Sequence, residues 1–288
     1  MSPIPAAILA VLAYTGMNVL FKRHAGAGGN TVALTAWLGL LTPFWGLALF
    51  LGAPPHLLNL PANPAYWTLT ALWAVLLPAT TLLTLHLFKT LSLIEVTAAR
   101  KALTTLFAVA VDALLLHTSF TMPTLFGVAI ITIAALALPT APSQSPHALP
   151  PPRAAALLAL LAALLTLQLL AYKQALAYQP DLPSHIIIAK FLASLFCLPL
   201  FLLIPKNDRQ RPTVPLILAV AACYLLGSVA EGFALRGLPL TVLIAVTTAT
   251  AALMAAHDLW RKDLPRTPRT LALLAVIFAG FVILALSR

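Results

Sequence analysis

Charged and hydroxyl side chains interrupt the apolar segment at residues 92–113. An ionisable residue inside a membrane span costs roughly 2.5–3.5 kcal/mol on insertion scales, so it is a functional candidate by default. On a helix that turns about 100° per residue, the polar side chains of this segment fall within one arc roughly 140° wide. They are Thr97, Arg100, Lys101, Thr104, Thr105 and Asp112.

This polar face predicts the wall of a water-filled cavity that binds an anionic group. Arg and Lys are the side chains that pair with carboxylates and phosphates, and only Arg makes a planar, two-pronged contact. The alternative is a structural ion pair with a carboxylate on a neighbouring helix. Glu95, at the start of the segment, is expected to interact with the positive end of the helix dipole instead.

A second polar face is predicted in the segment 239–259, where Thr247, Thr248, Thr250 and Asp258 fall in an arc of similar width. Its place in the second half of the chain corresponds to that of the first face, so we expect the two to oppose each other. The alternative is helix packing through threonine and small residues, which is common in membranes.

The remaining intramembrane candidates are single polar residues in other apolar segments. We predict substrate contacts from Arg100, Lys101, Thr104, Thr97, Asn18, Gln168, Lys190, Thr247, Thr248 and Glu231. The candidates for proton coupling are Asp112, Glu231 and Asp258. Tyr14, Trp37, Tyr172, Thr84 and His86 are weaker candidates, because interfacial anchoring explains such residues more often.

Catalytic and metal-binding patterns are missing from the sequence. It has no Gly-rich phosphate loop, no Gly-x-Ser-x-Gly and no His-x-x-x-His. Cys197 and Cys223 lie in apolar runs without ligands at metal-site spacing, so both are expected to be packed thiols. We therefore expect neither an enzyme nor a bound metal or cofactor.

The elements that must position these residues follow from composition. The chain has 288 residues, of which 61% are hydrophobic and 8% are charged, whereas soluble domains have about 25% charged residues. A spanning helix needs about 20 mostly apolar residues. Ten such segments lie at 4–21, 31–51, 65–88, 92–113, 121–138, 153–177, 184–205, 213–235, 239–259 and 268–287. They predict an all-α integral membrane protein with ten transmembrane helices, kinked at Pro43, Pro78 and Pro199.

The chain is expected to consist of two related halves. Residues 1–138 and 153–288 each contain five segments, and residues 139–152 form a Pro/Ser-rich linker. Lys22 and Lys173 close the first segment of each half, and Lys89-Thr-Leu-Ser-Leu93 corresponds to Arg236-Gly-Leu-Pro-Leu240. Because five is odd, the second half must enter the membrane from the opposite side, which gives an inverted repeat.

The distribution of basic residues predicts the orientation. Loops after odd-numbered segments hold 11 Lys and Arg, and the opposite side holds 3. Basic loops stay in the cytoplasm, so both termini are predicted outside, in a bacterial inner membrane. Although the net charge is +10, the basic residues occur singly or in pairs and form no continuous stripe. We therefore expect no nucleic-acid partner.

Two stretches carry a family resemblance. Phe233-Ala-Leu-Arg236-Gly-Leu-Pro-Leu240 and Tyr14-Thr-Gly16-Met-Asn18-Val-Leu-Phe-Lys22 resemble the step between helices 8 and 9, and the first helix, of EamA-type members of the drug/metabolite transporter superfamily. The resemblance implies ten helices in two five-helix halves and a role in secondary transport.

Three features depart from that family. Asp112-Ala113 and Asp258-Leu259 replace a Gly-Glu pair that the family often has. The pair Arg100-Lys101 is more similar to the phosphate-binding pairs of sugar-phosphate transporters. The family usually places both termini in the cytoplasm, opposite to the charge count above.

The sequence thus predicts a secondary active transporter or exchanger that moves a small polar metabolite, anionic or zwitterionic, by alternating access. Its cavity is expected between segments 1, 3, 4, 6, 8 and 9, in a monomer or homodimer embedded in the lipid bilayer. One alternative is an integral-membrane enzyme acting on a lipid or polyprenyl phosphate, with His117 or His257 as the acid or base. Another is a membrane subunit that does not transport.

Overall fold

The computed structural model describes residues 2–51, 60–137, 150–179, 181–205, 211–260 and 267–286, and every regular element in these ranges is helical. The elements are α1 (Pro3–Gly26), α2 (Thr31–Leu51), α3 (Pro64–Thr90), α4 (Leu93–Leu114), α5 (Met122–Leu136), α6 (Pro151–Tyr178), α7 (Leu182–Cys197), the 3-10 helix η1 (Leu198–Leu203), α8 (Val214–Gly237), α9 (Leu240–Thr247), α10 (Ala249–Trp260) and α11 (Pro268–Leu286). Most of the predicted linker lies outside the described residues.

The chain is a multi-pass helical membrane protein. Within the described ranges, six helical stretches are long and apolar enough to cross a membrane: Pro3–Gly26, Pro64–Thr90, Pro152–Tyr178, Leu182–Leu203, Val214–Gly237 and Leu240–His257. Shorter apolar stretches occur in α2, α5 and α11. The helix α4 is long but carries Glu95, Arg100, Lys101 and Asp112, and these charges lower its hydropathy.

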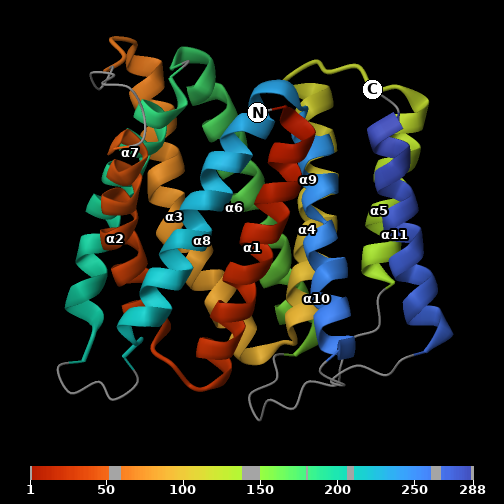
Figure 1. The fold of residues 1–288 in the computed structure, drawn as a ribbon, viewed down its shortest axis with the longest axis horizontal. Helices are drawn as coiled ribbons and strands as arrows, with labels where there is room; N and C mark the ends of the chain where they lie inside the picture. Colours follow the sequence, from red (N-terminus) through yellow and green to blue (C-terminus); the bar gives the residue numbers. More distant parts are fainter. Residues whose placement is uncertain are drawn as a thin grey trace.

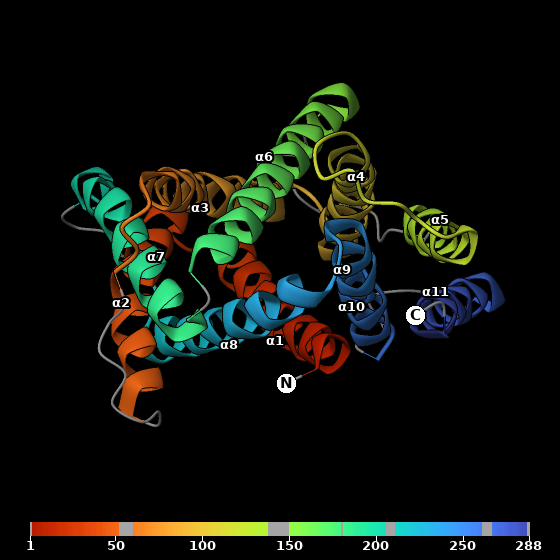
Figure 2. The same cartoon turned by 90° about the horizontal axis from the view of Figure 1, so that it is seen from above.

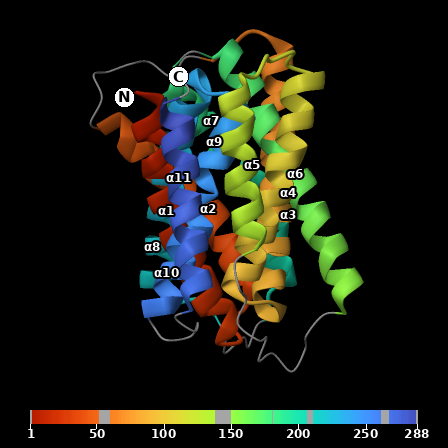
Figure 3. The same cartoon turned by 90° about the vertical axis from the view of Figure 1, so that its right-hand side faces the viewer.

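The helices run side by side as one bundle, and both termini lie at the same face (Figure 1). Viewed along the bundle, α2 and α7 occupy one end and α5 and α11 the other, with the remaining helices between them (Figure 2). The first helix of the chain ends at the face opposite the termini, and α3 and α10 end there too (Figure 3). Lys22, Arg23 and Lys89 lie at these helix ends.

The packing pairs join the first part of the chain to the second. The helix α1 packs against α8, and α3 packs against α6. Further cross-pairs are α2 with α7, α4 with α6 and α9, and α5 with α11. Each helix before the linker region therefore finds a main partner after it, so a cavity at the centre is lined by both parts of the chain.

Short polar side chains cap the starts of α3, α4, α5 and α7, where they satisfy backbone N–H groups that have no partner within the helix. Ser92 and Glu95 form a reciprocal capping box at the start of α4. This is the position expected for Glu95, an acid at a helix N-terminus. Asp181 caps α7 by accepting from the backbone N–H and the hydroxyl of Ser184.

The predicted helix 184–205 is not α-helical throughout. The helix α7 ends at Cys197, and the chain continues as the 3-10 helix η1. Pro199 is the second residue of η1. Proline has no N–H to donate and its ring clashes with the preceding turn, so an α-helix cannot continue through it without distortion.

The predicted helix 239–259 is also divided, because α9 ends at Thr247 and α10 begins at Ala249. The hydroxyls of Thr247 and Thr248 both donate to the Ile244 carbonyl, at 3.0 and 2.9 Å. Such bonds from threonine back to the preceding turn compete with the helix ladder and bend helices. No proline marks this break, so the sequence predicts one continuous helix there.

Candidate functional site

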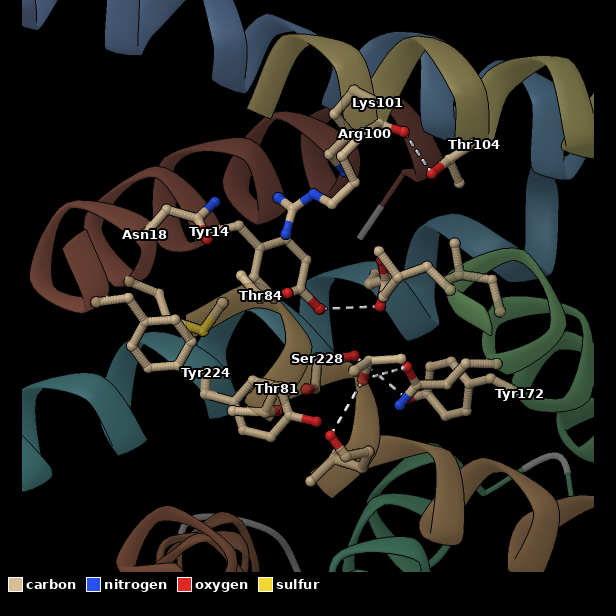
Figure 4. Close-up of a pocket in the computed structure, with 18 of the residues that line it drawn as sticks. Tyr14, Asn18, Thr81, Thr84, Arg100, Lys101, Thr104, Tyr172, Tyr224 and Ser228 are labelled. Carbon is tan, nitrogen blue, oxygen red and sulfur yellow. Dashed lines mark hydrogen bonds between the residues drawn. The ribbon is translucent and has the colours of Figure 1, made fainter. Parts of the chain in front are cut away.

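A central cavity of about 120 Å³ lies between five helices, α1, α3, α4, α6 and α8. By the same measure one water molecule needs roughly 10–15 Å³, so the cavity can hold a small polar molecule. Its lining contains Tyr14, Met17, Asn18, Phe21, Trp73, Leu77, Thr80, Thr81, Thr84, Arg100, Lys101, Thr104, Leu165, Gln168, Leu169, Tyr172, Tyr224, Ser228 and Glu231. Figure 4 shows how these side chains converge on the cavity.

Arg100 extends from α4 into the cavity (Figure 4). Its side chain is 7% exposed, and Nε is buried without a hydrogen-bond partner in the described part of the chain. A guanidinium stays protonated in proteins and has five donors. A buried charge is costly unless it is paired, so the cavity presents a cation that still requires an anion.

Lys101 follows Arg100 on α4 but points to the second part of the chain. Lys101 is one of the lining residues, and its Nζ donates a 2.8 Å hydrogen bond to Oγ1 of Thr247 at the end of α9. Thr104, one helical turn after Arg100, also lines the cavity, and its hydroxyl donates to the Arg100 carbonyl at 2.7 Å. The predicted polar face of α4 thus reaches the cavity through three residues.

Glu231 on α8 is the acidic residue of the lining. The hydroxyl of Tyr14 on α1 donates a 2.9 Å hydrogen bond to Oε2 of Glu231. Arg100, Lys101 and Glu231 therefore face one cavity from two different helices. A ligand carrying an anionic group together with a donor group can be held between them.

Two amides complete the polar lining. Asn18 is 1% exposed, and neither Oδ1 nor Nδ2 has a partner among the described residues. Gln168 accepts a 3.2 Å hydrogen bond from the hydroxyl of Thr80. Because a buried amide without hydrogen bonds is unfavourable, Asn18 offers both a donor and an acceptor to a molecule in the cavity.

One wall of the cavity is aromatic. The rings of Trp73 and Tyr172 lie 5.7 Å apart, and His185 stacks on Tyr172 at 4.9 Å. Behind the lining, Nζ of Lys190 lies 3.6 Å from the centre of the Tyr224 ring and donates to Ser228 at 2.8 Å. Lys190 therefore supports the wall through a cation–π contact and does not line the cavity itself.

Several predicted site residues lie elsewhere. The hydroxyl of Thr97 contacts the Leu93 carbonyl and the sulfur of Met254. Asp112 is fully buried and accepts from the backbone N–H groups of Leu240 and Thr241, at 3.3 and 2.7 Å. Thr247 and Thr248 lie at the α9–α10 break and do not line the cavity.

The second polar face therefore reaches the cavity only through the hydrogen bond from Lys101 to Thr247. The predicted contribution of segment 9 to the lining is absent from the described part of the structure. The side chain of Asp258 lies outside the described residues.

Sequence reasoning missed several lining residues on α3 and α8. Tyr224, Ser228 and Glu231 follow one another at intervals of four and three residues, which places them on one helix face. Extending the face from Glu231 would have identified the other two. Thr80 and Thr81 carried no comparable indication, because threonine is common in membrane helices as a packing residue.

Comparisons with known proteins show the fold alone. No family model and no curated protein sequence matches this chain. A solved structure described only as "Crystal structure of protein" matches with a TM-score of 0.73 over 99% of this chain and 96% of that one, at 16% sequence identity. The helical arrangement therefore occurs in another protein of nearly the same extent.

Proposed function

We propose that the protein is a secondary transporter or exchanger for a small anionic or zwitterionic metabolite, which it binds in the central cavity. The observation that carries the proposal is the buried side chain of Arg100, which lines the cavity and whose Nε has no hydrogen-bond partner among the described residues. A structural ion pair, the alternative considered for Arg100, would need a carboxylate within reach. Asp112, on the same helix face as Arg100, is bonded to α9 instead, and Glu231, which shares the cavity, accepts a hydrogen bond from Tyr14.

We further propose that the two halves form an inverted repeat of five helices each. Lys22 near the end of α1 donates to the carbonyls of Phe88 and Leu91 at the end of α3, at 2.7 and 2.8 Å. Lys173 on α6 donates in the same way to Leu235 and Leu238 at the end of α8, at 3.2 and 2.6 Å. The same contact thus recurs between corresponding segments.

The crossing of α5 and α11 supports the same symmetry. A Cβ at Gly127 would lie 3.3 Å from the Gly280 carbonyl oxygen, and a Cβ at Gly280 would lie 3.3 Å from the Gly127 carbonyl oxygen. Each glycine lets the opposite backbone approach closely. Inverted repeats of this kind allow alternating access, in which one half rocks against the other around a site near the midplane.

For coupling, we propose that Glu231 carries the proton, if transport is proton-driven. It lines the cavity and is held by a single side-chain hydrogen bond from Tyr14. Asp112 is less suitable, because protonation would weaken its two bonds to the start of α9 and leave buried N–H groups unsatisfied.

No specific contact of the described residues supports the enzyme alternative. His117 is exposed beyond the end of α4 and does not line the cavity, and neither does His257. Membership of the drug/metabolite transporter superfamily, a bacterial inner-membrane location and external termini remain proposals that rest on the motif residues and the loop charges.

Flux measurements in proteoliposomes test the proposed function. Liposomes containing the full chain are loaded with one unlabelled anion and exposed to labelled inorganic phosphate, dicarboxylates, sugar phosphates or amino acids. We expect uptake of at least one class by the wild type, near-complete loss in Arg100→Gln, and unchanged uptake in the control Arg23→Gln. Arg23 is exposed near the end of α1 and is not part of the cavity lining. Absence of flux for every class, or equal flux in Arg100→Gln, would overturn the proposal.

A further inference from the structure

Both ends of the short helix α9 are held by side chains of α4. At its start, the Asp112 carboxylate accepts from the backbone N–H groups of Leu240 and Thr241. At its end, Nζ of Lys101 donates to Oγ1 of Thr247 at 2.8 Å. The two helices run in opposite directions, so α4 clamps α9 along its full length.

The two clamps differ in their access to the cavity. Asp112 is fully buried and is not part of the lining. Lys101 lines the cavity, whereas its partner Thr247 does not. An anion on Arg100 would therefore meet the neighbouring Lys101, but it would have no route to Asp112.

The contact between Lys101 and Thr247 is also the one that an anion can replace. The Thr247 hydroxyl donates to the Ile244 carbonyl at 3.0 Å, so it accepts from Lys101 through a lone pair. That acceptor is neutral, and hydrogen bonds to an ionised acceptor are roughly twice as strong. Nζ has three donors, so the contact with Thr247 is broken only if a carboxylate or phosphate beside Arg100 draws Nζ into the cavity, which Thr247 does not line.

The position of Thr247 gives this exchange a structural consequence. Thr247 is the last residue of α9, and α10 begins two residues later at Ala249. At the joint, the Thr248 N–H is shared between the carbonyls of Ile244 and Ala245, at 2.9 and 3.1 Å, and the Thr248 carbonyl accepts a 3-10-type bond from Ala251 at 2.9 Å. The Lys101–Thr247 hydrogen bond thus joins α4, in the first half, to the α9–α10 joint. We call this hydrogen bond the tie.

We infer that the Thr247 hydroxyl accepts the Lys101 hydrogen bond only while no anion is bound. An anion bound at Arg100 replaces Thr247 as the acceptor, and the α9–α10 joint is then no longer held by α4. The inference rests on the proposed anion site. It goes beyond that proposal because it assigns the two adjacent basic residues different roles. Arg100 binds the anion, and the loss of the Lys101–Thr247 hydrogen bond couples that binding to the second half.

Hydrogen–deuterium exchange of the full chain in lipid nanodiscs tests the release step. The readout is the exchange rate of residues 244–251, with and without inorganic phosphate, and with succinate as a carboxylate probe. We expect each probe that binds to accelerate exchange at the joint roughly three- to tenfold, which corresponds to the loss of one hydrogen bond. Arg100→Gln should abolish this response.

Variants at Thr247 separate the tie from a general packing role. Thr247→Val should accelerate exchange at the joint without any anion and should bind the effective probe roughly tenfold more tightly, because no tie has to be broken. Thr247→Ser, which keeps the hydroxyl, should behave like the wild type. Thr250→Val is the matched control, since the Thr250 hydroxyl is buried without a partner in the described structure.

Tighter anion binding is the result that a merely structural threonine would not give. Weaker or unchanged binding in Thr247→Val would overturn the inference, and so would wild-type binding without faster exchange at the joint. In both cases the anion site of the proposed function would stand. If neither probe shows Arg100-dependent binding, the anion site and the tie fail together.

Discussion

The hydroxyl of Tyr14 donates a 2.9 Å hydrogen bond to the Glu231 carboxylate and so joins α1 to α8 beside the cavity. Glu231 differs in this from every other acid whose side chain the structure describes. Glu95 caps α4, Asp112 caps α9 and Asp181 caps α7. Three of these four carboxylates cap a helix, and Glu231 is the one that lines the cavity.

Replacing Glu231 is therefore predicted to remove coupling to protons. In proteoliposomes, the wild-type flux should change when a pH gradient is imposed, whereas Glu231→Gln should show the same flux with and without the gradient. Exchange at equal pH should persist in the variant, because Arg100 remains. The ionisable groups around Glu231 are Tyr14, Arg100, Lys101, Tyr172, Lys190 and Tyr224.

A matched variant separates the proton from the hydrogen bond. Tyr14→Phe removes the donor to Glu231 but leaves the carboxylate, so the response to the gradient should be weakened and not lost. Equal gradient responses in the wild type and in Glu231→Gln would remove Glu231 from the coupling mechanism.

Asp112 is predicted to act on stability and not on coupling. The change Asp112→Asn replaces a carboxylate that accepts from two buried N–H groups with an amide that has one acceptor oxygen. Unfolding free energy should fall by about 1–3 kcal/mol, measured as a lower melting temperature in detergent. The gradient response of the surviving protein should be normal; loss of that response at unchanged stability would refute this role.

The close approach of α5 and α11 predicts a cost for side chains at their crossing. In Gly127→Ala, the new methyl group would lie 2.9 Å from Leu284 and 3.3 Å from the Gly280 carbonyl oxygen. Such overpacking destabilises by roughly 1–3 kcal/mol. The control is Gly26→Ala, where a Cβ meets nothing within 4 Å. Thermal unfolding of both variants measures the difference, and equal melting temperatures would show that α5 and α11 can separate at no cost.

Both termini are predicted to lie outside the cytoplasm. They share one face of the bundle, and the helix ends that carry Lys22, Arg23 and Lys89 lie at the opposite face (Figures 1 and 3). Cytoplasmic loops are rich in Lys and Arg. A C-terminal alkaline phosphatase fusion should therefore be active and a green fluorescent protein fusion dim in bacterial cells. The reverse pattern would place the termini inside, as in the family that the sequence resembles.

The sequence predicted the helices well and the site only in part. Apolar runs of about 20 residues between proline-rich joints are a local pattern, so each predicted segment coincides with helix in the described ranges, although 184–205 and 239–259 are each divided in two. Periodicity also placed Arg100 and Thr104 on one face, and both line the cavity. The same arc contains Thr97, which contacts Met254 instead, because the period of a helix defines a direction and not the depth of a cavity.

Other features depend on contacts between distant segments. Asp112 caps a helix that begins 128 residues later, and no local pattern links a carboxylate to that position. At the break, the hydroxyls of Thr247 and Thr248 bond back to Ile244, but Thr104 makes the same kind of bond to Arg100 within an unbroken helix. The presence of threonine therefore does not predict where a helix divides.

The location of a bound anion tests the central claim most directly. Selenate scatters anomalously and mimics the charge and shape of phosphate or sulfate, so a crystal grown with selenate would reveal its site without assumptions about the substrate. The account predicts an anomalous peak within hydrogen-bonding distance of the Arg100 guanidinium, and its loss in Arg100→Gln. A peak remote from Arg100, or a guanidinium found paired with the Glu231 carboxylate and bound to no selenate, would contradict it.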